Sequence, residues 1–207
     1  MGKSCSICGK AYKARPLGEK VVEFPACNCV YDLRKAENEA REQELRLIKA
    51  KWLMPNVRAF GGAACAGATF ALATDAGVKA AESQIIPAPH TAIISYSNEL
   101  KAREACVCIS RKLIAEGYST IPIDVHQVIA ETDWSDLYGA EVVILHKLDD
   151  ILLDSSESNR IFSFIDKRYR AERITWATTG KPKSELPSAW GKELSRILTE
   201  DCVFIQI

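Results

Sequence analysis

The stretch Ala140-Glu-Val-Val-Ile-Leu145 is the clearest strand signal in this chain of 207 residues, because it is a short run of aliphatic and β-branched side chains. Further segments of the same kind lie on both sides of it, and helical segments separate them. The expected strands cover 91–96, 119–124, 140–145, 174–178 and 202–207, and the expected helices cover 99–116, 125–131, 158–171 and 186–198. Strands that alternate with helices predict an α/β fold with a mostly parallel sheet covered on both faces.

Pro122 bears on the position of one of these strands. Proline has no N–H to donate to a neighbouring strand, so Pro122 places the strand 119–124 at an edge of the sheet or near a strand end.

A charged helix and a stretch of small residues precede this domain. Pro55 is expected to end the helix, and the small residues of 59–68 to form a flexible crossing. The predicted organisation is therefore a module over 1–32, a linker helix over 33–58 and the α/β domain over 59–207. The helix has only a narrow apolar stripe, typical of a solvated connection, with a partner-binding helix as the alternative; the stripe includes Leu33, Ala36, Ala40, Leu47 and Trp52.

Four cysteines lie close together near the start of the chain: Cys5, Cys8, Cys27 and Cys29. A Cys-x-x-Cys pair followed by glycine is typical of a metal-binding turn, and four thiolates suit tetrahedral Zn²⁺. The alternatives are ordinary buried cysteines and a redox pair, but no thioredoxin-like strand and helix surround Cys5. We therefore predict one structural zinc ion in the N-terminal module, without zinc catalysis. The other cysteines are expected to be structural.

The composition limits the other classes of function. Lys+Arg and Asp+Glu are both 27, so the formal net charge is zero and no global field attracts nucleic acid or anionic lipid. No run of about 18 apolar residues predicts a membrane span, and the chain begins without an apolar leader, so we expect a cytoplasmic location and no membrane partner. The three histidines, His90, His126 and His146, are expected to be surface or capping residues.

Several segments of the α/β domain occur in an order found in one known family. They are Arg111-Lys-Leu-Ile-Ala-Glu-Gly-Tyr118, Val142-Val-Ile-Leu145, Ile161-Phe-Ser-Phe-Ile-Asp-Lys-Arg-Tyr169 and Trp190-Gly-Lys-Glu-Leu-Ser-Arg196. In this order the chain resembles the AAA+ replicative-helicase loaders of the DnaC/DnaI type and their IstB-type relatives. The resemblance implies a cysteine-bearing N-terminal module, a linker helix and a P-loop/AAA+-like ATPase domain.

The chain departs from that family at its chemical positions. Counting back from Gly117 places Ala102 at the phosphate-binding lysine, Lys101 at a glycine and Arg103 at the magnesium-binding hydroxyl. His146 and Lys147 stand where the family has two acidic residues. Arg196 matches the terminal arginine, and the polar sensor position falls near Thr178 or Thr179. Both nucleotide motifs are therefore degenerate, which predicts a pseudo-ATPase that binds no ATP; the alternative is an α/β domain that never bound nucleotide.

Three functions follow from these observations. The first is a non-hydrolysing, helicase-loader-like accessory protein of plasmid or phage type, which binds the replicative helicase or its loader or initiator. The second is a module that binds DNA, with single-stranded DNA as the candidate form, through basic residues interleaved with acidic ones. The third is an active ATPase that uses Lys101, Asp149 and Asp150. The candidates for DNA contact are Lys167, Arg168, Arg170, Arg173, Lys181 and Lys183.

Overall fold

The computed structural model describes residues 4–17, 20–25, 27–85, 91–151, 156–199 and 202–207. The chain divides into two compact units, residues 1–47 and residues 48–207. The division falls inside the segment 33–58 that the sequence assigns to a linker helix.

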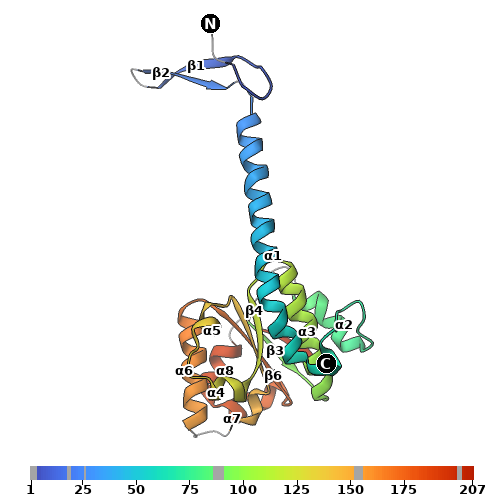
Figure 1. Cartoon of the computed structure of the whole chain (residues 1–207). Helices are drawn as coiled ribbons and strands as arrows, with labels where there is room; N and C mark the ends of the chain where they lie inside the picture. The colour runs from blue at the N-terminus through green and yellow to red at the C-terminus, as the bar shows by residue number, and fades with distance from the viewer. Residues whose placement is uncertain (1–3, 18–19, 26, 86–90, 152–155, 200–201) are drawn as a thin grey trace. The chain divides into compact units, whose positions relative to one another are not determined.

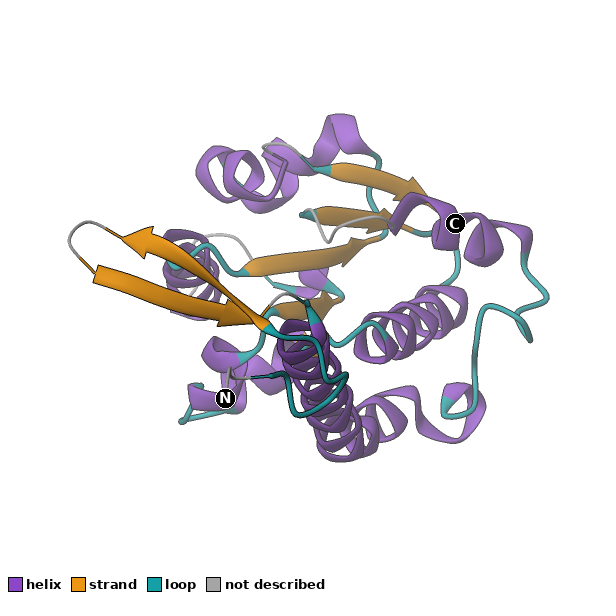
Figure 2. Cartoon of the chain, turned by 90° about the horizontal axis from the view of Figure 1, so that it is seen from above, coloured by secondary structure: helices purple, strands orange, loops and turns teal. Residues whose placement is uncertain are grey.

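The first unit contains a β-hairpin. Strands β1 (Tyr12–Leu17) and β2 (Lys20–Pro25) pair antiparallel, with Tyr12 opposite Pro25 and Arg15 opposite Val22. Figure 2 shows the two strands side by side. The strands expected from the sequence all lie at 91–207, so none of them corresponds to this hairpin. The alternation of apolar and polar residues in these strands is short, and cysteines and turn residues surround it. The hairpin is therefore seen in the structure and not in the sequence.

Helix α1 (Cys29–Cys65) is longer than the sequence indicates, and the predicted end at Pro55 is wrong. Pro55 lies inside the helix with its ring exposed, and helical structure continues into the region expected to be a flexible crossing. Proline inside a helix costs about 3 kcal/mol. Here Val57 and Phe60, both buried in the core beyond the proline, offset that cost. Gly62, at φ 60° and ψ −166°, interrupts the helix near its end.

The remaining helices and strands all belong to the second unit. In chain order they are α2 (Ala76–Ile85), β3 (Ala92–Ser95), α3 (Glu99–Ala115), β4 (Thr120–Asp124), α4 (Val125–Ala130), α5 (Ser135–Gly139), β5 (Val142–His146), the 3₁₀ turn η1 (Leu148–Asp150), α6 (Ser156–Arg170), β6 (Ile174–Thr179), the 3₁₀ turn η2 (Lys183–Glu185), α7 (Leu186–Trp190), α8 (Lys192–Thr199) and β7 (Val203–Gln206). The helix expected over 186–198 is thus two helices, since Gly191 adopts φ 79° between α7 and α8.

The sheet of the second unit has the strand order β4-β5-β6-β3-β7, and all its neighbouring strands are parallel. This confirms the predicted α/β fold class. The proline-containing strand β4 lies at one edge, as Pro122 indicates.

Helices cover both faces of this sheet (Figure 1). Ile94, Ile144 and Trp176 face one core, which also contains residues of α1, α2 and α3. Their sequence neighbours, such as Ile93 and Ala177, face a second core that contains residues of α4, α6 and α8. Strands buried on both faces explain the continuous apolar runs in the sequence. In the described part of the chain, no helix combines the length and the apolar character that crossing a bilayer requires.

Arg168 is fully buried on α6, so its prediction as a DNA contact is wrong. Its guanidinium donates hydrogen bonds to the carbonyl oxygens of Leu137, Ala140 (3.0 Å) and Ile174 (2.6 Å), and to the Thr175 hydroxyl (3.1 Å). Burial, with a smaller contribution from the nearby charge of Arg173, lowers the pKa of Arg168 to about 10, so the side chain stays charged at neutral pH. One cation therefore joins the amino-terminal ends of two strands to α5 and α6.

Arg168→Met is expected to lower the free energy of unfolding by about 3 kcal/mol, because buried carbonyl groups lose their donor. Urea unfolding followed by circular dichroism measures this change. Arg170→Met is the matched control: Arg170 lies on the same helix, is exposed, and pairs with Asp166. It should change stability by less than about 0.5 kcal/mol. Equal effects of the two variants would contradict the structural role of Arg168.

Candidate functional site

The four predicted cysteine ligands come together in the first unit. The sulfur atoms of Cys5, Cys8, Cys27 and Cys29 all lie within 4.8 Å of one another. Backbone hydrogen bonds from Cys5 N to Lys10 O (2.8 Å) and from Gly9 N to Cys5 O (2.9 Å) close the first turn, and the positive φ of Gly9 (72°) permits it. Cys29 is the first residue of α1. Four clustered sulfurs are a donor set that can hold a metal ion.

The cluster also perturbs its own thiols. The backbone N–H groups of Cys8 and then Ile7 lower the pKa of Cys5 to about 7. Hydrogen bonds with the sulfurs of Cys8 and Cys27 raise the pKa of Cys29 to about 12. Sulfurs this close cannot all ionise without a compensating cation, and a bound metal ion supplies that charge.

The other cysteines agree with a structural role. Cys65, Cys106 and Cys108 are buried in the second unit, and burial raises the pKa of each thiol. Cys202 is partly buried.

The region that the family uses for phosphate binding is the amino-terminal end of α3. The side chain of Asn98 caps this helix and accepts hydrogen bonds from the backbone N–H groups of Leu100 (2.9 Å) and Lys101 (3.3 Å). These are N–H groups of the kind that a phosphate accepts at a helix start. The Asn98 side chain therefore occupies two N–H groups that could otherwise bind an anion.

Three cations at the nucleotide-site positions pair with carboxylates of the same unit. Lys101 Nζ lies 2.5 Å from Asp75 Oδ2, Arg103 binds Asp124 through both guanidinium nitrogens at 3.1–3.4 Å, and Lys147 Nζ lies 2.8 Å from Glu99 Oε1. The pKa values of Asp75 and Glu99 are lowered, in each case chiefly by the hydrogen bond from the lysine partner. Each of the three cations is thus paired with a carboxylate of the same unit.

Arg103 has a further role as an anchor for helix α1. Its guanidinium donates to the Phe60 carbonyl oxygen (2.8 Å) and lies 4.8 Å from the centre of the Phe60 ring. A hydroxyl side chain, as the family pattern has here, cannot make these contacts. Ala102, the neighbouring position, is fully buried in α3 and presents no polar group.

His146 is fully buried, so the expectation of a surface or capping residue is wrong for it. Its Nδ1 lies 2.9 Å from the Thr178 hydroxyl, and its ring contacts the edge of Phe60 and stacks on Tyr96. Burial, and then the positive charge of Arg103, lowers the pKa of His146 to about 4, so the ring is neutral at pH 7. A neutral imidazole does not supply the carboxylate chemistry of the family. His126 is exposed, and His90 lies outside the described residues.

The acidic residues of the active-ATPase hypothesis have structural partners. Asp149 accepts hydrogen bonds from the Thr179 hydroxyl (2.8 Å), Gly180 N (2.6 Å) and Trp190 Nε1 (2.9 Å). It therefore joins the end of β6 to α7. Asp150 lies 3.5 Å from His126 Nε2.

The remaining candidates are exposed and do not gather into the same site. Arg196 lies on α8, whereas Arg170, Arg173, Lys181 and Lys183 lie on or after α6 and β6. Lys167, also exposed, lies 4.1 Å from the ring centre of Tyr138. Arg168 is thus buried and unavailable to DNA, whereas the other predicted DNA contacts are exposed cations on different parts of the surface.

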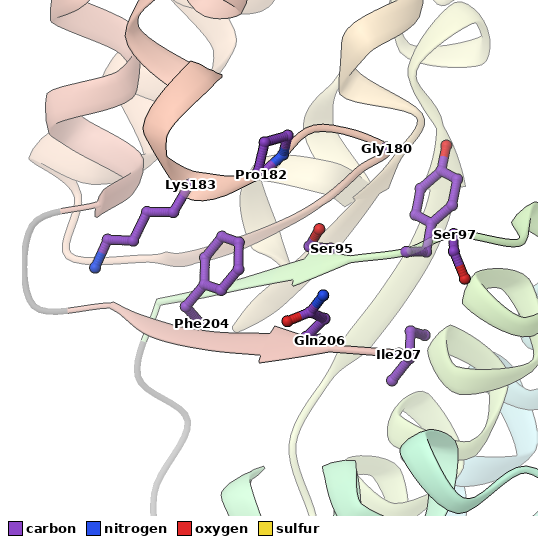
Figure 3. A pocket seen from close by; sticks show the side chains of 9 residues that line it. Ser95, Ser97, Gly180, Pro182, Lys183, Phe204, Gln206 and Ile207 are labelled. Atoms are coloured by element: carbon purple, nitrogen blue, oxygen red, sulfur yellow. The ribbon is translucent and has the colours of Figure 1, made fainter.

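A cavity of about 550 Å³ opens at the carboxyl ends of β3, β6 and β7 (Figure 3). Its lining includes Ser97, Gly180, Lys183, Phe204 and Gln206. Connections from β3 and β6 leave the sheet toward opposite faces here, which is where ligands bind in open parallel sheets. None of the nucleotide-site positions lines this cavity: Lys101, Ala102, Arg103, His146, Lys147 and Arg196 all lie outside it.

Sequence reasoning missed the partners that compensate the cations. Asp124 directly follows a predicted strand, so its place at the carboxyl edge was a usable signal. Asp75 and Phe60 have no such signal, because they come from segments whose packing against α3 appears only in the folded chain.

Several solved structures of replication proteins share this fold. The DnaC helicase loader aligns with a TM-score of 0.53 at 15% identity, over 68% of this chain and 96% of that chain. DnaI aligns with a TM-score of 0.51 at 13% identity, over 68% of this chain and 88% of that one. AMPPCP-bound DnaA from Aquifex aeolicus aligns with a TM-score of 0.50 at 12% identity, over 67% of this chain and 50% of that chain, so the match spans about half of that protein.

No family model and no curated protein matches the sequence. At this level of identity the likeness concerns the fold alone. It confirms the predicted fold, which the second unit shares with DnaC and DnaI.

Proposed function

We propose that this protein is a helicase-loader-like replication accessory protein that does not hydrolyse ATP and acts by binding the replicative helicase or its loader. One observation carries the proposal: Lys101, Arg103 and Lys147 are paired with Asp75, Asp124 and Glu99 in a loader-type fold. A loader fold without ATPase chemistry also fits a plasmid- or phage-type origin.

A triphosphate has little to bind at this edge of the sheet. No glycine lies between Tyr96 and Arg103 to let the backbone approach phosphates. Glu99 adds a carboxylate beside them, and its pairing with Lys147 at 2.8 Å occupies a lysine that could otherwise contact a phosphate.

Titration calorimetry with ATP and Mg²⁺ is expected to show no binding heat at millimolar nucleotide, because the phosphate-binding groups are absent or paired. The full-length, metal-loaded protein should be used. Micromolar binding would show instead that the chain is a working ATPase. In that case ATP turnover abolished by Lys101→Ala would identify Lys101 as its phosphate ligand.

The cysteine cluster is proposed to hold one structural Zn²⁺ ion. In such a site Zn–S distances of about 2.3 Å place neighbouring sulfurs about 3.8 Å apart, which a small contraction of this cluster reaches. The hairpin beside the cluster has only two strands, which are marginal without further support. The ion would therefore hold the first unit together without a catalytic role.

Purified protein is expected to contain one zinc ion per chain by inductively coupled plasma mass spectrometry. Cys8→Ser should lose the ion, because Cys8 lies in the cluster. Cys202→Ser should retain it, since Cys202 lies outside the cluster. A zinc content that Cys8→Ser leaves unchanged would contradict the site.

Direct binding to replication proteins tests the central proposal. Purified replicative helicase or its loader should be retained by the immobilised full-length protein, with or without ATP, because no nucleotide cycle is involved. Retention that requires ATP would contradict the non-hydrolysing mechanism. The absence of retention with both proteins would remove the proposed partner class.

A further inference from the structure

We propose that one exposed face of helix α1 in the second unit binds an acidic amphipathic helix of the replicative helicase or loader. The face, called the α1 stripe below, consists of Ile48, Trp52, Pro55 and Ala59. This inference rests on the proposed function for the identity of its partner. It goes further by assigning the contact surface and the chemistry that recognises it.

The α1 stripe is a second apolar face on a helix that already has one. Residues 48, 52, 55 and 59 recur at helical spacing and are all exposed. The core of the second unit is contacted by other residues of the same helix, including Leu53, Val57 and Phe60. Packing against the core therefore does not account for the apolar residues of the α1 stripe.

Trp52 is the main anchor of this face. Its side chain is 77% exposed, and Ile48, one turn away, is 46% exposed. An exposed tryptophan beside a second apolar side chain offers a large area for burial, and tryptophan is enriched among the residues that dominate binding energies.

A groove lies beside the α1 stripe. It has a volume of about 470 Å³, and Trp52, Leu53 and Asn56 of α1 form one side. The other side consists of residues around the start of β4 and around α5: Ser119, Ile121, Ser135, Asp136, Gly139 and Ala140. A groove with both apolar and polar lining, next to an exposed aromatic side chain, suits an amphipathic helix laid along it.

The charges around the stripe favour an acidic partner. Lys51 and Arg58 are exposed on the same flank, two helical turns apart, and no acidic residue occurs between residues 45 and 58. Lys49 is compensated by Glu141 at 3.6 Å, whereas no carboxylate of the described residues forms an ion pair with Lys51 or Arg58.

Asp136 is the acidic residue that lines the groove, so the cations lie on one flank and a carboxylate on the other. A partner helix fits when its apolar stripe covers Trp52 and its acidic residues face Lys51 and Arg58. Charge pairs at such a rim act mainly on association rate and specificity.

The test uses surface plasmon resonance with purified replicative helicase and loader over immobilised full-length protein. Trp52→Ala should weaken binding roughly 30-fold, the range of an anchor residue. Lys51→Glu combined with Arg58→Glu should weaken it roughly tenfold and reduce its salt dependence. Leu72→Ala and Lys192→Glu are matched controls, because both residues are exposed and lie outside α1 and the lining of the groove, and should leave affinity unchanged.

Each outcome has a separate meaning. Wild-type binding that both α1 variants retain would overturn this surface while leaving the proposed function intact. If the wild-type protein binds neither the helicase nor the loader, the proposed function fails and this proposal fails with it. Sedimentation of the wild-type protein as a dimer that Trp52→Ala dissociates would assign the stripe to a second copy and overturn the acidic partner helix. Circular dichroism of each variant separates these results from misfolding.

Discussion

The guanidinium of Arg103 is the interaction on which the carboxyl edge of the sheet depends. It binds both Asp124 at the end of β4 and the Phe60 carbonyl oxygen near the end of α1, from a position on α3. One side chain thus fastens three elements that are distant in the sequence. A planar cation with several fixed donors can do this, and a hydroxyl or a lysine cannot satisfy the same set. Arg103 therefore has a structural role at this edge.

Ion pairs of this kind compensate the charges that gather at the carboxyl edge of the sheet. The carboxyl edge gathers polar loop residues, and the start of a helix carries partial positive charge. In a nucleotide-binding protein the ligand compensates that charge. Here Asn98, Glu99, Asp75 and Asp124 do so from within the second unit. The three cations at this edge, Lys101, Arg103 and Lys147, are thus each paired with a carboxylate of the same unit.

The sheet could be predicted from the sequence because its strands are buried on both faces and read as short aliphatic runs, with Ala140–Leu145 the clearest. The cysteine site could be predicted from ligand spacing alone, and the structure brings the four sulfurs together. The end of α1 could not be predicted, since the burial of Val57 and Phe60 outweighs the local preference of Pro55. Arg168 was misassigned because a basic residue in a charged segment gives no sign that backbone carbonyls surround it.

The difference between paired and unpaired groups also indicates where this molecule can bind a ligand. A polar group that is hydrogen-bonded within the fold, such as Arg168 or Asp149, contributes to the fold and has little left to offer a ligand. Two features of the described residues offer more to a ligand: four sulfurs that cannot all ionise without a cation, and a helix with a second apolar face bordered by cations without a carboxylate partner. The chemistry of each feature indicates its ligand. A metal ion suits the first, and a partner surface with acidic and apolar residues suits the second. The proposed binding functions of this protein are therefore placed at the cysteine cluster and at the α1 stripe.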